Sequence, residues 1–325
     1  MRSSDARRAL GFTVVLAAAS ALSSSAGAQQ QAQGFGVERF YPAAPGGGWF
    51  VMDALDMRGG LGGAMALTTS YARDPLRITD GSQHLSVVSD RAFTDFGFAV
   101  TYERWRLDLN MDVPMVTAGQ DGTVGGYHFT VPSLNPQQNP DTLSDARIGL
   151  DARILGGSKS PFRLGASAQL FVPNGDRVDY DTDGTYRAMV RALFAGDVGL
   201  FTYAGHLGVH VRPLDDSPTP GSPQGSELLF GLAGGARVLV AGGNEALIVG
   251  PEVFGATAFR SFLGSNGTAL EGLLAGRIEG VSDNGPQLRF KLGAGLGIDP
   301  RFGAPAWRVV FAIELFGHTS DRNED

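Results

Sequence analysis

The sequence predicts an all-β protein, a transmembrane antiparallel up-and-down β-barrel of about 12 strands. Three observations predict this fold: strand-like runs that alternate apolar and polar side chains, links between them that alternate in length, and a secretory leader ahead of them. Successive side chains of a strand point to opposite faces, so each run has one apolar face and one polar face. In a closed sheet within a membrane, the apolar faces contact lipid and the polar faces line the interior.

Residues 1–28 have the pattern of a signal peptide. Three arginines among the first eight residues precede an apolar run at 9–22, and Ala26 and Ala28 supply the small-x-small cleavage pattern. The apolar run is shorter than the ~18 residues of a spanning helix. We therefore expect secretion, with Gln29 as the first residue of the mature chain.

Composition narrows the classes of function. Removal of the leader takes away three basic residues and one acidic residue, which changes the net charge from −7 to −9. An acidic chain of this kind is not expected to bind nucleic acid. The chain has no cysteine, so disulfides and thiol chemistry are absent. No cofactor is predicted.

Residues 29–60 leave two interpretations open. Pro42, Pro45 and the glycines at 46–48 argue against regular structure. The segment is either a periplasmic lead-in to the first strand or a plug that folds into the barrel. The apolar cluster at 49–52 requires burial, which keeps the plug hypothesis open.

The strands follow from residue 61 onwards. In the run at 200–212, for example, Phe201 and Leu207 face one side, whereas His206 and His210 face the other. An even number of strands is typical of bacterial outer-membrane barrels. The predicted strands are 61–71, 93–103, 105–115, 145–155, 162–172, 185–194, 200–212, 226–240, 246–258, 270–281, 287–298 and 307–316.

The links between the strands alternate in length. Short links lie near 103–104, 156–161, 195–198, 241–245 and 282–286, and longer links at 73–92, 116–144, 173–184, 213–225, 259–268 and 299–305. Outer-membrane barrels have short periplasmic turns and longer outer loops. We therefore expect a barrel over 61–317 in the outer membrane, a periplasmic tail at 318–325, and both termini in the periplasm.

The inward faces predict a charged lumen. Acidic and basic residues are close to balance there, so the preference for anions or cations stays open. About eight strands fill a barrel with their own side chains and about sixteen enclose an aqueous channel, so about twelve lies between these cases. The predicted lumen-lining residues are Arg106, Asp108, Arg147, Asp151, Arg153, Arg163, Arg187, Arg191, His206, His210, Arg212, Glu227, Arg237, Glu252, Arg277, Glu279, Arg289, Lys291, Arg308 and Glu314.

Sites for metal ions or catalysis have little support. His206 and His210 would lie roughly 13 Å apart along a strand, too far to bind one ion together. Asp179, Asp181 and Asp183 copy the start of a calcium loop, although position 12 is Val190 instead of glutamate. The alternatives are a weak divalent-ion site and a solvated acidic loop. No serine and histidine are placed within mutual reach, so we expect no enzyme activity.

Several short stretches resemble the barrel of a family of Gram-negative outer-membrane proteins that often precedes an OmpA-like peptidoglycan-binding domain. The resemblance implies the barrel architecture and covers most of the mature chain. The residues after Phe316 are too few for the peptidoglycan-binding domain, so anchoring to the cell wall is not implied. The stretches are VERF at 37–40, YARDPL at 71–76, LSVVSD at 85–90, GSELLFGLAGGARV at 225–238, VGPEVFGAT at 249–257 and GAPAWRVV at 303–310.

The charged interior favours a porin-like channel for small polar solutes. The alternative is a closed structural barrel that contacts other envelope components through its loops or periplasmic ends. Outer-membrane lipid and lipopolysaccharide are the expected surroundings, and a monomer is the expected state. An ordered plug over 29–60 would favour the closed barrel.

Overall fold

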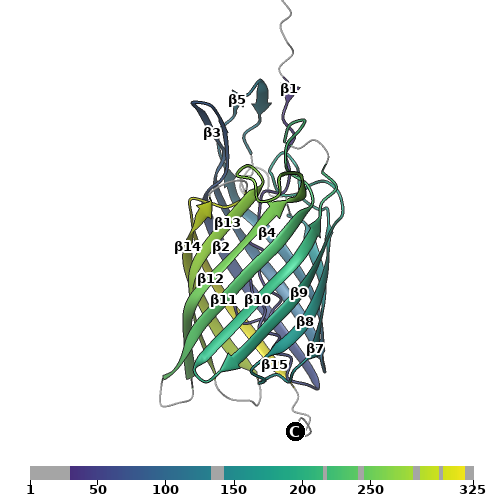
Figure 1. The fold of residues 1–325 in the computed structure, drawn as a ribbon, viewed down its shortest axis with the longest axis vertical. Helices are drawn as coiled ribbons and strands as arrows, with labels where there is room; N and C mark the ends of the chain where they lie inside the picture. The colour runs from purple at the N-terminus through teal and green to yellow at the C-terminus, as the bar shows by residue number, and fades with distance from the viewer. Residues whose placement is uncertain are drawn as a thin grey trace, which may run out of the picture.

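In a computed structural model, which describes residues 30–132, 143–214, 218–240, 245–280, 286–299 and 303–318, twelve antiparallel strands close into a barrel (Figure 1). This confirms the predicted fold. Each strand pairs with its neighbours in the chain, and β15 pairs with β2 to close the sheet. The barrel strands are β2 (Leu61–Asp80), β3 (Gln83–Tyr102), β4 (Trp105–Ala118), β7 (Ala146–Leu155), β8 (Arg163–Val172), β9 (Arg187–Val198), β10 (Phe201–Val211), β11 (Glu227–Val240), β12 (Glu245–Ala258), β13 (Thr268–Gly280), β14 (Gln287–Asp299) and β15 (Trp307–His318).

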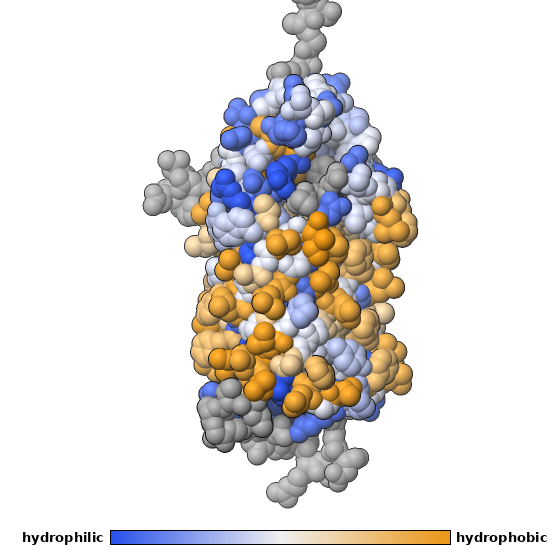
Figure 2. Space-filling model, turned by 60° about the vertical axis from the view of Figure 1, so that its left-hand side comes forward, coloured by the Kyte–Doolittle hydropathy of each residue, from blue (hydrophilic) through white to orange (hydrophobic). Residues whose placement is uncertain are grey.

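Each strand has an apolar outer face and a polar inner face, as β14 illustrates. Leu288, Phe290 and Leu292 are exposed on the outside, whereas Arg289 and Lys291 are buried inside. Figure 2 shows the apolar side chains as a broad band across the visible face of the barrel, below a hydrophilic end. Exposed apolar side chains over so much of the surface are stable only against lipid. The described residues contain no helix that is long and apolar enough to cross a membrane.

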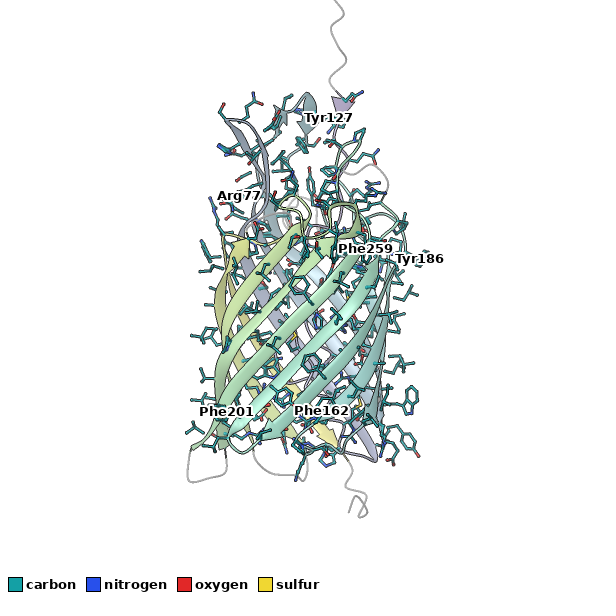
Figure 3. All side chains as sticks on the ribbon, viewed as in Figure 1. Arg77, Tyr127, Phe162, Tyr186, Phe201 and Phe259 are labelled. Carbon is teal, nitrogen blue, oxygen red and sulfur yellow. The ribbon has the colours of Figure 1, made fainter. Side chains whose placement is uncertain are left out.

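Aromatic side chains mark the two rims of the apolar band. Tyr186 and Phe259 lie on the upper rim in Figure 3, and Phe162 and Phe201 lie on the lower rim. All four are exposed. Girdles of aromatic residues at the two membrane interfaces are a property of outer-membrane barrels.

The two ends of the barrel differ. We call the upper end in Figure 1 the loop end and the other, where residues 103–104 join β3 to β4, the turn end. The loop end carries a hairpin of β5 (Gly122–Val124) and β6 (Tyr127–Phe129), and β6 pairs in parallel with β1 (Gln30–Gln31). A short 3-10 helix, Phe259–Ser261, follows β12 at this end.

One predicted loop is instead a hairpin. Residues 73–92, expected as a long link, extend β2 and β3 beyond the barrel to a tight turn at Gly81. The ladder shifts register between Arg73 and Leu76, beside Asp74 with φ 51°. This extension projects beyond the lipid, so its strands need no continuous apolar face and lack the alternation that marks the others.

The segment at 30–60, which we call the N-terminal segment, lies inside the barrel. It starts at the loop end beside β6, runs through the lumen, and joins β2 at the turn end, where Leu61 pairs with Tyr102. Almost all of its side chains from residue 35 to residue 57 are buried. Of the two interpretations that the sequence leaves open, this arrangement corresponds to the plug.

The first and last described residues lie at opposite ends of the barrel. Gln30 is at the loop end and His318 is at the turn end (Figure 1). The even number of strands places the start of β2 at the same end of the barrel as the end of β15. The N-terminal segment then crosses the barrel once more, through the lumen, so Gln30 lies at the other end. The predicted signal peptide, mature N-terminus and most of the C-terminal tail lie outside the described residues, so the periplasmic location of both termini stays a prediction.

Candidate functional site

The lumen, occupied by the N-terminal segment, is the candidate site. The segment has almost no regular structure, so its backbone groups need partners from the wall. The Glu252 carboxylate of β12 accepts hydrogen bonds from the backbone N–H groups of Phe50 at 2.8 Å, Val51 at 2.9 Å and Met52 at 3.4 Å. Gly48, with φ 92°, precedes this stretch and allows the sharp bend that presents the three N–H groups together.

Basic side chains of the wall bind the carbonyl groups of the segment. Arg147 donates to the Pro42 oxygen at 2.7 Å, and Lys291 donates to the Trp49 oxygen at 3.0 Å. Charge-assisted hydrogen bonds of this kind are stronger than those between neutral groups. The charged wall therefore satisfies an irregular backbone that would otherwise be costly to bury.

Ion pairs also join side chains of the segment to the wall. Near the loop end, Glu38 accepts from Arg308 at 2.8 Å and Arg39 donates to Glu227 at 2.9 Å. Near the turn end, Asp53 pairs with Arg106, which also binds Asp151. All of these side chains are buried.

Apolar contacts fill the space between the charged pairs. Phe40 of the segment packs against Phe93 and Phe254 of the wall, with ring centroids 6.3 and 6.0 Å apart. Trp49, Phe50, Met52 and Leu55 belong to the same buried cluster. The inward apolar wall residues were not predicted, because they occupy positions of the face that the alternation marks as polar.

The predicted lumen residues lie where the alternation places them. Nineteen of the twenty are buried, and the exception, Arg237, has 42% of its side chain exposed at the turn end. Several of them pair with one another: Arg289 binds Glu314 at 2.7 Å, and Lys291 binds the same carboxylate at 2.6 Å. They therefore surround the segment instead of lining a water-filled passage.

The two lumen histidines are packed among aromatic rings. His210 stacks on Phe171 with ring centroids 5.2 Å apart and meets Tyr41 edge to face at 5.6 Å. His206 is also buried. Among the residues that the structure describes, no group of three or more histidine or acidic side chains converges as a metal site does.

The acidic loop between β8 and β9 binds arginines. Asp181 lies 2.5 Å from Arg91, and Asp183 binds Arg212 at 2.6 Å and accepts from the Gly36 N–H at 2.8 Å. The weak metal site predicted at Asp179, Asp181 and Asp183 is thus not assembled, because two of its carboxylates are turned to separate guanidinium groups.

Burial acts differently on these two carboxyl groups. It raises the pKa of Asp181 to about 6, in spite of the nearby Arg91. Burial also opposes ionisation of Asp183, but the guanidinium groups of Arg212 and Arg187 outweigh it and hold the pKa of Asp183 well below its usual range. Asp183 therefore carries a fixed negative charge.

Space remains mainly at the two ends of the lumen. A vestibule of about 720 Å³ lies at the loop end beside Arg77 and His84, and a cup of about 370 Å³ lies at the turn end. Between segment and wall, the spaces beside Trp49 and beside Arg39 hold only about 10 Å³ each. Neither of these two spaces has room for a hydrated ion.

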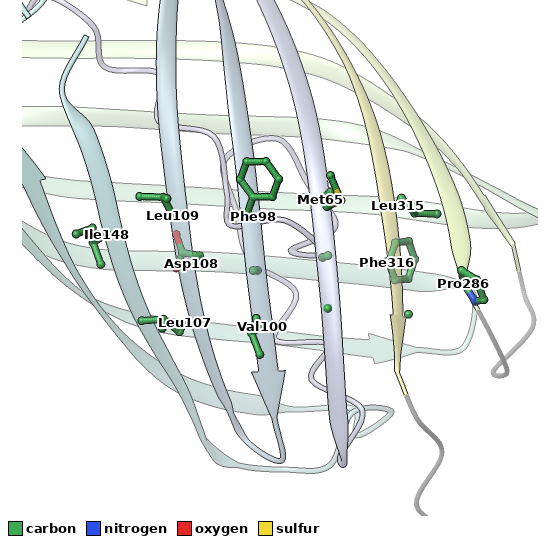
Figure 4. Close-up of a pocket in the computed structure, with 14 residues that line it drawn as sticks. Met65, Phe98, Val100, Leu107, Asp108, Leu109, Ile148, Pro286, Leu315 and Phe316 are labelled. Carbon is green, nitrogen blue, oxygen red and sulfur yellow. The ribbon is translucent and has the colours of Figure 1, made fainter. Parts of the chain in front are cut away.

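An apolar groove of about 650 Å³ lies on the outer wall near the turn end (Figure 4). Met65, Phe98, Leu107 and Ile148, all on the outer face, form part of its lining. Because the groove faces lipid, it is not part of a path for polar solutes.

Four of the six stretches that resemble an outer-membrane protein family meet at the loop end. Glu38 and Arg39, from 37–40, contact Arg308 and Glu227, which belong to two other stretches. The Gly303 N–H also donates to the Pro75 oxygen, from a fourth stretch. The resemblance therefore involves the junction of segment and wall as well as the strands.

Comparisons with known proteins found no matching family model and no matching curated protein. Among solved structures, an outer-membrane channel from Pseudomonas putida F1 is 14% identical, over 80% of this chain and 95% of that one, with a TM-score of 0.49. The NanC porin is 7% identical (79% and 100% covered, TM-score 0.43), and the CymD monoaromatic hydrocarbon channel is 10% identical (83% and 91% covered, TM-score 0.42). At these low scores, the barrel architecture rests on the strand pairing and the apolar exterior described above.

Proposed function

We propose that this outer-membrane β-barrel is a channel for small polar solutes that its own N-terminal segment holds closed. The observation that carries the proposal is the way the wall holds the segment. Glu252, Arg147 and Lys291 bind its backbone, and charged groups such as Arg308 bind its side chains. The same wall groups would be solvated by water when the segment leaves.

The space that the segment occupies is wide enough for a passage. A barrel of about eight strands is filled by its own side chains, whereas this twelve-stranded barrel encloses a further piece of chain. A chain with its side chains needs roughly 10 Å, the spacing between packed sheets. Withdrawal of the segment would open a polar path of comparable width.

In its resting state the channel is closed. Phe40, Phe50, Met52 and Leu55 of the segment are almost fully buried. At about 1.5–3 kcal/mol for each side chain, their exposure to water would cost about 6–12 kcal/mol. Spontaneous withdrawal is therefore rare, and opening requires a partner, a voltage or another force. This differs from the steady conductance expected of an open porin.

A permanently closed barrel is the second candidate. The ordered N-terminal segment favours it, as the sequence predicts for an ordered plug. The inward side chains of Phe93, Leu193 and Phe254 favour it too, because an empty lumen would expose them to water. Such a barrel would act as a scaffold that contacts other envelope components through its two ends. In both cases we propose a monomer in outer-membrane lipid and lipopolysaccharide, without enzyme activity.

Conductance across a planar bilayer distinguishes the two candidates. The mature chain, residues 29–325, should be silent at low voltage, and removal of residues 32–57 should give steady unitary steps. If the shortened chain inserts correctly and stays silent, the channel proposal is wrong and the scaffold is favoured.

A reversible lock provides a second test that does not depend on the deletion. A Cβ atom at Gly46 would lie 3.6 Å from the Cβ atom of Ala64 on the wall, a separation that suits a disulfide. Because Gly46 has φ 83°, a side chain there strains the backbone, so the single variant Gly46→Cys must first stay silent at low voltage. In Gly46→Cys/Ala64→Cys, steps evoked by high voltage should disappear on oxidation and return with a reductant. Each single variant is the matched control, because the natural chain has no cysteine. Steps that persist in the oxidised double variant would exclude withdrawal of the segment as the gate.

A further inference from the structure

We infer that the cup at the turn end is a binding site for a small oxyanion, one that carries a phosphate or carboxylate group. The cup, of about 370 Å³, is formed jointly by the end of the N-terminal segment, the turn at 158–159 and the ends of several wall strands. Its volume lies within the range of small-molecule pockets. The site is independent of the proposed channel, since it requires only the closed barrel that the structure shows.

The lining of the cup has an excess of positive charge. Six basic residues and three acidic residues contribute to it. The basic residues are Arg58, Lys159, Arg163, Arg237, Arg277 and Arg289, and the acidic residues are Asp56, Asp197 and Glu279.

Each acidic residue lies within 3.0 Å of one arginine. Asp56 lies 3.0 Å from Arg58, and Asp197 lies 2.8 Å from Arg163. Glu279 accepts from Arg289 at 2.6 Å. The three carboxylates are thus committed to partners, and the excess charge centres on the remaining arginines.

Arg277 is the principal candidate for binding the oxyanion. It is only 5% exposed, yet its Nε atom and one of its terminal nitrogens have no hydrogen-bond partner. Its nearest carboxylate oxygen, on Glu279, is 3.4 Å from Nε, and its guanidinium lies 4.7 Å from the ring centre of Trp49. A buried donor without an acceptor costs free energy, so an acceptor from solution would bind favourably.

Arg237 offers a second, accessible guanidinium across the cup. Its side chain is 42% exposed, and its closest carboxylates, Asp197 and Glu279, lie at 3.8 and 3.7 Å, beyond hydrogen-bonding distance. Two arginines that share one anion match the geometry of phosphate and carboxylate groups, which accept two parallel N–H bonds. The same chemistry suits a free anion and the headgroup of an anionic lipid.

Fluorescence of Trp49 can detect the bound anion in a Trp105→Phe/Trp307→Phe background, because the Trp49 indole lies against Arg277. The mature chain in zwitterionic detergent would be titrated with inorganic phosphate and with succinate, at constant ionic strength set by chloride. We expect a saturable change in fluorescence. Arg277→Gln should raise the half-saturation concentration roughly tenfold or more, because charge-assisted hydrogen bonds to the anion are lost.

Arg77→Gln, at the loop end, is the control with the same change of charge. Arg237→Gln is the second test variant, because its side chain is partly exposed and has no carboxylate within hydrogen-bonding distance, and it should also weaken binding. A phosphate titration of the chain in nanodiscs, either of phosphatidylglycerol or of phosphatidylcholine, distinguishes a free anion from a lipid headgroup as the occupant. Loss of the phosphate response in phosphatidylglycerol alone would identify the lipid headgroup as the occupant, and an equal response in both would identify a free anion. The absence of a saturable change, or equal weakening by Arg77→Gln, would overturn the inference.

Discussion

Replacement of Glu252 by glutamine should loosen the middle of the N-terminal segment and leave the barrel intact. The Glu252 carboxylate accepts three backbone N–H groups of the segment, from Phe50, Val51 and Met52. A glutamine of the same shape has one carbonyl oxygen, and its amide NH₂ group would face N–H donors. At least one backbone N–H would therefore lose its acceptor in a fully buried position.

The size of the effect follows from the bonds lost. Hydrogen bonds to a charged group contribute about 1.5–3 kcal/mol each, and an unsatisfied buried donor costs about 1–3 kcal/mol. We expect Glu252→Gln to lower the free energy of local opening by about 3 kcal/mol. Since about 1.4 kcal/mol corresponds to a factor of ten, amide exchange at 50–52 should accelerate by roughly a hundredfold.

Hydrogen exchange measured by mass spectrometry on peptides that cover 48–54 would test this value. Glu245→Gln is the matched control, because Glu245 begins the same strand, β12, and is exposed. The control should leave exchange at 50–52 unchanged. Equal exchange in wild type and Glu252→Gln would refute the role of this carboxylate in holding the segment.

Two further predictions concern the loop end. Asp183→Asn should release the Gly36 amide to exchange, because Arg212 loses a buried partner, a change that costs about 3–5 kcal/mol. In wild type, protection of the Gly36 amide should persist from pH 7 to pH 4.5. Because its pKa is lowered, Asp183 stays ionised and keeps its stabilising contacts until much lower pH. Asp181, with a pKa of about 6, takes up a proton in this range and becomes less unfavourable to bury. Loss of Gly36 protection near pH 6 would contradict this assignment. Arg308→Lys keeps the charge but loses the planar guanidinium that binds Glu38, Glu271 and Ser70. The urea concentration at the midpoint of segment release, followed by Trp49 fluorescence, should therefore fall clearly. The same substitution at the exposed Arg73 should shift this midpoint little, and equal shifts would argue against the role of the buried contacts.

The sequence was most informative where each strand contacts lipid on one face and the lumen on the other. In β14, strict alternation from Leu288 to Leu292 predicts both the strand and the direction of every side chain. The β2–β3 extension was not predicted as strand. It lies beyond the membrane, where residues such as Arg77 and His84 need not alternate with apolar residues.

The path of the N-terminal segment could only be narrowed to two alternatives. Its contacts are with many strands that are distant in the sequence, so no period records them. The cluster at 49–52 indicated a need for burial but not its location. Likewise, the pairing of Asp183 with Arg212 and Gly36 depends on a loop, a strand and the segment meeting, which motif spacing does not encode. The calcium-like spacing was therefore misleading.

The wall holds the segment at three successive levels, and this arrangement determines how it can open. Glu38 and Arg39 are bound near the loop end, Phe50 and Val51 at the middle, and Asp53 near the turn end. Loosening one level leaves the lumen blocked at the other two, because the segment stays bound to the wall there. Glu252→Gln should therefore accelerate exchange at 50–52 without producing conductance in a planar bilayer. Steps from this single variant would show that the middle level alone is the gate, and that withdrawal of the whole segment is unnecessary.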